Sequence, residues 1–268
     1  PQSIETARAE HPLNRAYLQA GKQAGYNYTE DQNGEIHEGF HIAQSFTLNG
    51  KRCSAARAYL YPALRRPNLT VETNCMIHKI QFDGIRAVKV VGEQRGNIVS
   101  FEAGREIILC GGAINSPQIL ELSGIGKRDV LEEKSIPVIH ELKGVGENLR
   151  DHIAPRIIYK ITKPGIAYND KARGFNLIKQ VANYIFKKDG FLTLPSAPVV
   201  GFFKTRKELA APDIQVHFIP YKVVLENGKR KLGVEPGITC TVNQNLPESK
   251  GSIPVSYTHL TLPTKRIV

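Results

Sequence analysis

The chain has 268 residues, of which 41% are hydrophobic and 23% are charged, and its 36 basic and 25 acidic residues give a net charge of +11. This length allows two domains with sizeable cores, and the composition is that of an ordinary globular protein. No apolar run approaches the roughly 20 residues of a membrane span, and the scattered basic residues lack the interleaved aromatic rings that stack on single-stranded nucleic acid, so we expect neither a membrane span nor nucleic-acid binding.

The chain begins at Pro1 rather than at a methionine, and we interpret it as an internal fragment whose first residues carry no targeting information. Two glycosylation sequons, Asn27-Tyr28-Thr29 and Asn68-Leu69-Thr70, favour an extracellular protein only slightly, because such triplets often arise by chance. The four cysteines show no CxxC spacing, so we predict no metal site.

Residues 1–55 are predicted to form a helix and loops. Pro12 suits the first position of a helix, and Gly25 suits its end. The stretch DQNGEIHEGF at 31–40 predicts turns, and Arg57 to Leu64 predicts a second short helix.

From Asn68 the hydrophobic period changes to two, which predicts a meander of antiparallel strands with a hairpin turn at Asp83-Gly84. The expected strands are residues 68–73, 76–82, 85–91 and 97–101. The next run, REIILC at 105–110, has consecutive apolar positions, so it predicts a strand covered on both faces with Cys110 buried at its end. A meander followed by such a strand is typical of FAD-binding relatives of the Rossmann fold.

A double-glycine turn follows this strand. Gly111 and Gly112 let the backbone approach another group without Cβ interference. Ser116 is predicted to be the N-cap of a helix, with Pro117 as its first residue. The unpaired N–H groups and partial positive charge of that helix start suit an anionic ligand. The alternative is a tight strand-to-helix connection that binds nothing.

A second glycine-rich motif, GVGENLRDH, occupies residues 144–152, and the pattern changes after it. One helix is predicted at Phe175 to Lys187, among strands at RIIYKI, PVVGFFK, DIQVHFI and GITCTV, which indicates a mostly antiparallel sheet in a second, α+β domain. The last residues, 254–268, show no continuity with this pattern; the alternatives are a native irregular tail and a non-native or out-of-frame tail, and we favour the second.

The run GAINSPQILELSGIG at 112–126 resembles the second signature of the glucose-methanol-choline (GMC) oxidoreductases, which bind FAD and oxidise alcohols. GVGENLRDH is similar to the GVGxNLxDH corner of that family, and RRPNLTVETNCMIHKI and GREIILCGGA also match it. PDIQVHFIP resembles the substrate domain, especially of insect, glucose dehydrogenase-like members. The resemblance extends from about Gly50 to Ile253.

The resemblance implies an incomplete α/β FAD-binding domain of the Rossmann-like, glutathione-reductase type, plus an α+β substrate domain with a mostly antiparallel sheet. On this basis we expect residues 1–55 to link to the flavin domain. Residues 56–153 would form part of the FAD-binding domain, and residues 154–253 part of the substrate-binding domain, with the tail at 254–268.

The same resemblance implies which residues contact the cofactor. The backbone at Ile77 would pair with the edge of the flavin adenine, and the turn formed by Gly111, Gly112, Asn115 and Ser116 would approach FAD, with Asn115 as a side-chain donor. The alternatives are that Ile77 is only a core strand residue and that Asn115 serves the turn locally.

The implied reaction is FAD-dependent oxidation of an alcohol, with a sugar such as glucose among the candidates, by hydride transfer to flavin N5; the electron acceptor is oxygen or another compound. The GxGxxG turn that holds the pyrophosphate and the motif with the catalytic histidine have no match here, so we expect the fragment alone to be inactive and not to hold FAD tightly. We interpret His152 as structural rather than catalytic. The alternative function is a non-catalytic relative that keeps the fold as a binding or structural module; an NAD-type Rossmann enzyme is disfavoured.

Overall fold

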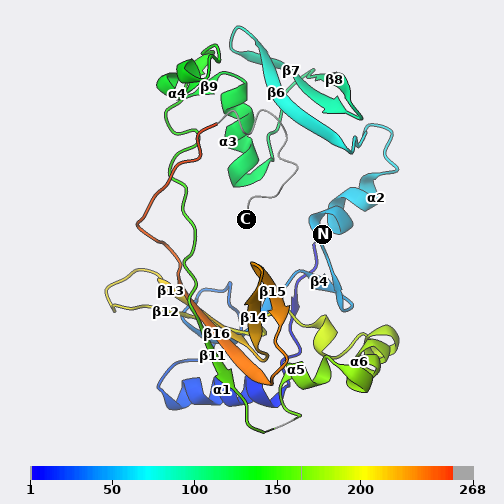
Figure 1. The fold of residues 1–268 in the computed structure, drawn as a ribbon, viewed down its shortest axis with the longest axis vertical. Helices are drawn as coiled ribbons and strands as arrows, with labels where there is room; N and C mark the ends of the chain where they lie inside the picture. The colour runs from blue at the N-terminus through cyan, green and yellow to red at the C-terminus, as the bar shows by residue number, and fades with distance from the viewer. Residues whose placement is uncertain (1, 164, 256–268) are drawn as a thin grey trace. The chain divides into compact units, whose positions relative to one another are not determined.

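The computed structural model describes residues 2–163 and 165–255. The chain divides into two compact units. Unit 1 comprises Pro1–Leu69 and His152–Leu246, and unit 2 comprises Thr70–Asp151 and the residues from Pro247 onward. The two units therefore alternate along the chain, and Figure 1 labels most of their longer elements. The functional domains expected from the sequence stay predictions, because these units are defined by packing alone.

Unit 1 is built on a five-stranded antiparallel sheet with the strand order β11-β16-β13-β12-β2. Its strands are Arg156–Lys160 (β11), Gly237–Gln244 (β16), Ile214–Ile219 (β13), Val199–Phe203 (β12) and Gly39–Ile42 (β2). The mostly antiparallel sheet predicted for the second domain is confirmed. Strand β2 was not predicted, since its sequence lies at the end of a stretch expected to form turns; it becomes an edge strand because β12 supplies its backbone partners.

Helix α1 (Pro12–Gln23) covers one face of this sheet (Figure 1). The helix begins at Pro12 as predicted, and the side chain of His11 caps it by accepting the N–H of Leu13 at 3.3 Å. Tyr17 stacks on Phe218 with the ring centroids 4.2 Å apart. Apolar residues of the helix thus bury the inner face of the sheet, where Val199 is fully buried.

Phe40 lies at the centre of this core because two glycines leave room for its ring. A Cβ added to Gly21 of α1 would lie 2.4 Å from Cε2 of Phe40. A Cβ added to Gly201 of β12 would lie 2.8 Å from Cδ1 of the same ring. Gly21 therefore sets how closely α1 packs on the sheet, and Gly201 leaves room for the ring beside its pairing partner on β2.

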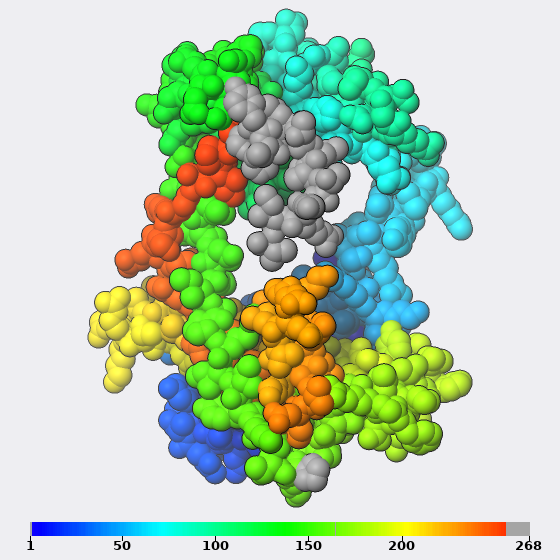
Figure 2. All heavy atoms as spheres, in the orientation of Figure 1, coloured from blue at the N-terminus to red at the C-terminus, as the bar shows by residue number. Residues whose placement is uncertain are grey.

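Unit 1 contains further helices and strands outside this sheet. They are β1 (Glu5–Thr6), β3 (Gln44–Ser45), β4 (Thr47–Leu48), β5 (Lys51–Arg52), η1 (Ala56–Leu60), α2 (Tyr61–Ala63), α5 (Tyr168–Lys171), α6 (Gly174–Lys187), η2 (Phe191–Thr193), β14 (Val223–Glu226) and β15 (Lys229–Leu232). The helices predicted near residues 57–64 and 175–187 are present. Strands β14 and β15 form a hairpin whose turn, Asn227-Gly228, has positive φ at both residues. Figure 2 shows this hairpin in orange at the surface of unit 1.

Unit 2 contains the predicted meander, formed by β6 (Cys75–Asp83), β7 (Arg86–Gln94) and β8 (Asn97–Glu102). Helix α3 (Gly112–Leu122) packs against β6, and the hydroxyl of Ser123 accepts the backbone N–H of Ile80 at 2.8 Å. The remaining elements are β9 (Ile125–Gly126), α4 (Arg128–Glu133) and β10 (His140–Glu141), and β9 and β10 pair in parallel.

Two predicted strands are absent from the described residues. Residues 68–73 form no strand, and the run at 105–110 pairs with no described segment. The prediction of a covered strand there was wrong for these residues: Ile108 is 75% exposed, and Cys110 is exposed rather than buried. A strand exists only where a neighbour supplies hydrogen-bonding partners, and apolar composition cannot supply them. Most of the expected tail, from residue 256, lies outside the described residues.

No helix in residues 2–163 and 165–255 is long and apolar enough to cross a membrane.

We expect Gly21→Ala to destabilise unit 1 even though alanine favours a helix by about 1 kcal/mol over glycine. The added methyl group would meet the buried ring of Phe40, and overpacking of this kind costs about 1–3 kcal/mol. Urea unfolding would measure the loss. Gly104→Ala is the control, because a Cβ there meets nothing within 4 Å; an equal effect of both substitutions would contradict the packing argument.

Candidate functional site

The two glycine-rich motifs of unit 2 meet at a pocket of about 680 Å³, called here the unit 2 pocket. One wall comes from the first half of α3 and the other from the second motif. The lining residues are Ala113, Ser116, Pro117, Leu120, Leu142, Gly144, Val145, Gly146, Glu147, Asn148, Leu149, Arg150 and Ile253. Motifs separated by about 20 residues in the sequence thus form one concave surface.

Helix α3 begins earlier than the sequence predicted. Its first residue is Gly112 and its N-cap is Gly111, so Ser116 and Pro117 lie inside the helix instead of at its start. The prediction was wrong because Gly112 adopts a φ of +79°, which allows the chain to turn into the helix at once. Pro117 has no N–H to donate to the carbonyl of Ala113, so one bond of the first turns is missing.

No side chain among residues 2–163 and 165–255 caps the start of α3. Gly111, the N-cap residue, has no side chain of its own. A Cβ on Gly112 would find no described atom within 4 Å. The first-turn N–H groups and the positive end of the helix dipole are therefore available to an anionic group that approaches the backbone closely. The chemistry of this turn fits the phosphate-bearing part of a dinucleotide.

Some of the residues predicted to contact the cofactor lie at the unit 2 pocket, and others do not. Ser116 lines the unit 2 pocket, and Gly111 and Gly112 stand at the adjoining end of α3. Asn115 is exposed in the first turns of that helix. Ile77 does not line the pocket; it lies on β6, an edge strand of the meander that packs against α3. The contact of these residues with FAD stays a prediction.

Glu121 ties the two motifs together, and sequence reasoning did not single it out. It is only 1% exposed, and its Oε2 accepts the N–H of Val255 at 2.6 Å. A Cβ on Gly146 would lie 3.1 Å from its Oε1, and one on Gly126 would lie 3.1 Å from its Cγ. Burial raises the pKa of this carboxyl above its ordinary value. The available signal was an acidic residue between Leu120 and Leu122.

His152, at the end of the second motif, belongs to unit 1. Its Nε2 donates to the carbonyl of Asn245 at 2.9 Å, because a carbonyl can only accept. Its Nδ1 then accepts from the side chain of Asn243 at 3.3 Å. Both ring nitrogens are engaged by the sheet, which agrees with our interpretation of His152 as structural.

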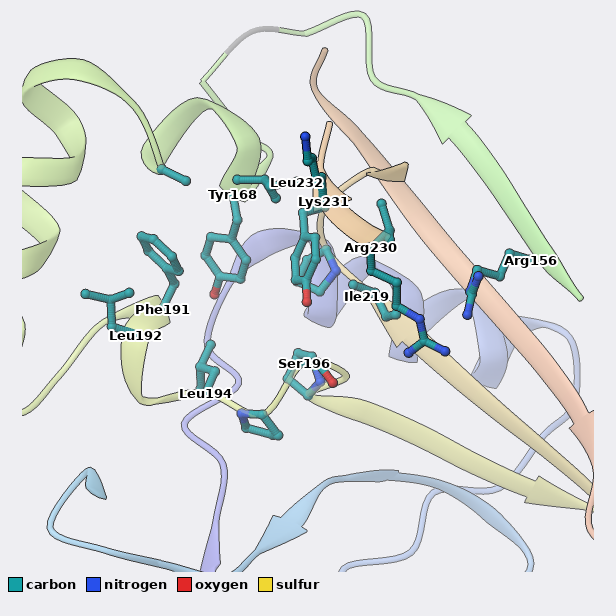
Figure 3. A pocket seen from close by; sticks show the side chains of 16 residues that line it. Arg156, Tyr168, Phe191, Leu192, Leu194, Ser196, Ile219, Arg230, Lys231 and Leu232 are labelled. Atoms are coloured by element: carbon teal, nitrogen blue, oxygen red, sulfur yellow. The ribbon is translucent and has the colours of Figure 1, made fainter. Parts of the chain in front are cut away.

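A second cavity, called here the unit 1 pocket, measures about 540 Å³ and lies between the sheet, α5, η2 and the β14–β15 hairpin (Figure 3). Its lining residues are Arg156, Tyr168, Ala172, Phe191, Leu192, Leu194, Pro195, Ser196, Pro198, Ile219, Pro220, Tyr221, Val223, Arg230, Lys231 and Leu232. The sequence analysis missed this pocket, although Asn227-Gly228 between two β-like runs predicts the hairpin. Among the described residues, no group of three His, Cys, Asp or Glu could hold a metal ion.

Comparison with known proteins connects these features to one family. Residues 3–154 match the family described as GMC oxidoreductase. The oxygen-dependent choline dehydrogenase of Chromohalobacter salexigens is 42% identical over 255 residues, which are 94% of this chain and 45% of that protein. The mitochondrial choline dehydrogenase of Mus musculus is 38% identical over 230 residues, which are 86% of this chain and 38% of that protein. The chain thus spans less than half the length of these relatives.

Solved structures share the fold. Pyridoxine 4-oxidase from Mesorbium loti superposes with a TM-score of 0.75 at 25% identity over 94% of this chain and 45% of its own. A formate oxidase superposes with a TM-score of 0.80 at 21% identity over 91% of this chain and 47% of its own. These likenesses confirm the expected fold class. The names of the relatives do not support the glucose dehydrogenase-like subgroup that the sequence suggested.

The free energy of unfolding of the parent protein should fall as the pH rises, because the buried Glu121 becomes charged. We expect Glu121→Gln to abolish this part of the pH dependence. The folded carboxyl has a raised pKa, so between the ordinary value of 4.5 and the raised value the folded state holds more protons than the unfolded state. Stability then falls with rising pH across that window. Glutamine stays neutral and still accepts the N–H of Val255.

Urea unfolding between about pH 4 and pH 8 tests this expectation. The stability difference between Glu121→Gln and the parent should grow in favour of the variant as the pH rises and then level off. Glu102→Gln, at an exposed position of β8, is the control. A difference that does not change with pH would show that burial of Glu121 does not disfavour its charge.

Proposed function

Because the chain belongs to the GMC oxidoreductase family, we propose that the protein oxidises an alcohol with FAD as its cofactor. One observation supports this proposal above the others: both family motifs line one pocket in unit 2, beside an uncapped helix start that a ligand can approach. The resemblance in sequence and the arrangement in space therefore agree on the same location.

FAD, when bound, supplies the acceptor for the two electrons and the proton that leave the alcohol carbon as hydride. The residues of this chain supply binding and orientation. The first-turn N–H groups of α3 would donate to anionic oxygens, and Arg150, which lines the same pocket, adds a positive charge. The hydrogen bond from the N–H of Ile80 to the hydroxyl of Ser123 holds the end of α3 against β6. This contact helps to keep the first-turn N–H groups of the helix in position.

The substrate side of the proposal concerns unit 1. Its pocket has aromatic and aliphatic walls that can exclude water from a bound molecule. Choline is a candidate alcohol, because the relatives are named choline dehydrogenases. A sugar, expected from the sequence, remains a candidate without support from those names.

Anaerobic titration of the full-length protein tests the function. We expect the purified protein to show flavin absorption and to lose the oxidised-flavin band when a substrate alcohol is added. Choline, glucose and benzyl alcohol form the first panel. A flavin-loaded protein that no alcohol reduces would favour the non-catalytic alternative, and a protein free of flavin after reconstitution with FAD would contradict the cofactor assignment.

We expect Gly112→Val in the full-length protein to lower flavin occupancy. A β-branched side chain at a φ of +79° is strained, and it would project into the open space before α3, where the cofactor would approach. The ratio of flavin to protein absorbance measures occupancy.

Gly25→Val provides the matched control, because Gly25 has a φ of +87° and open space around its Cβ position but lies in unit 1. Its substitution carries similar strain without touching the turn. Equal flavin occupancy in both variants would count against the assigned turn.

A further inference from the structure

The unit 1 pocket combines an apolar body with cationic groups. Tyr168 of α5 and Phe191 of η2 stand 5.4 Å apart, centroid to centroid, in a stacked arrangement on one wall. Burial raises the pKa of Tyr168 to about 12, so its phenol stays neutral and can donate a hydrogen bond. This wall suits a flat or aliphatic molecule.

Two guanidinium groups line the pocket, that of the half-buried Arg156 and that of the exposed Arg230. Arg156 comes from β11 and Arg230 from β15, and neither forms an ion pair with any residue in 2–163 or 165–255. Figure 3 shows both side chains directed to the same end of the pocket. The third cation, Lys231, is paired with Glu226.

The lining contains no carboxylate among the described residues. A lining with cations and no carboxylate attracts an anion more than a cation. Guanidinium groups also match the planar geometry of a carboxylate or the oxygens of a sulfate or phosphate ester, which they bind through paired hydrogen bonds. A quaternary ammonium group would meet only repulsion from these arginines.

We propose that the unit 1 pocket binds an organic anion with an apolar or aromatic body, held by Arg156 and Arg230, and that this molecule is the alcohol substrate. The binding claim stands on the pocket alone, whereas the identification as substrate rests on the proposed function. The substrate class thereby differs from the choline in the names of the relatives.

Calorimetric binding to the full-length protein tests the claim with probes that differ in charge. The anionic probe is 4-(hydroxymethyl)benzoate, the neutral one is 4-methylbenzyl alcohol, and choline is the cation. We expect the benzoate to bind at least about tenfold more tightly than the neutral alcohol. Its affinity should fall when salt is added. Equal affinities, or tighter binding of choline, would overturn the proposal.

Substitutions locate the charge that matters. Arg230→Gln should lower the affinity for the benzoate by about tenfold or more and leave the affinity for the neutral alcohol unchanged. Arg156→Gln should have the same effect. Lys229→Gln is the matched control, because it removes one positive charge from the same strand without lining the pocket. Thermal melting checks that each variant folds. If Lys229→Gln lowered the affinity for the benzoate equally, the effect would come from general surface charge, and the proposed anion site would be refuted.

Replacing the carboxylate of the probe by a sulfonate or a phosphate ester identifies the anion that the pocket prefers. Flavin reduction by the same probes separates the two parts of the proposal. A benzoate that binds through Arg230 but does not reduce the flavin would keep the anion site and refute its identification as the substrate site. Absence of flavin in the protein would instead refute the proposed function, while the binding measurement would still decide the anion site.

Discussion

One buried carboxyl group, that of Glu121, packs against glycines of both glycine-rich motifs of unit 2. Glu121 occupies the space that Gly126 and Gly146 leave empty, and it accepts the N–H of Val255. A buried acidic group without partners is costly, so the surrounding backbone is arranged to satisfy it. Close packing of Glu121 against Gly146 therefore joins α3 to the second motif, and these two segments form the walls of the unit 2 pocket.

The sequence predicted what depends on local pattern and missed what depends on distant partners. Helix α1 and the meander follow from periodicity and turn residues, and the structure has both. Strand β2 was missed because only β12 makes it a strand, and residues 105–110 were overpredicted because their apolar pattern cannot show whether a neighbouring strand is present. The early start of α3 depends on the positive φ of Gly112, which helix propensity does not describe.

The candidate sites show the same division. Ser116 was identified from its motif and lines the unit 2 pocket, whereas its contact with FAD stays a prediction. Arg156 and Arg230 lie 74 positions apart by residue number, and nothing in their local sequence brings them together. Their shared pocket arises from the sheet and the hairpin, so no local motif could have revealed it.

The interrupted chain of unit 1 has a consequence for biosynthesis. The backbone N–H of Lys204 bonds to Glu38 across 166 positions, and β2 pairs with β12 over a similar span. The meander of unit 2 joins neighbours in sequence and can close as soon as it is synthesised, whereas the edge of the larger sheet must wait for its partner to leave the ribosome. Until then Phe40 has no cover from β12, and an uncovered aromatic ring adds to the risk that the nascent polypeptide aggregates.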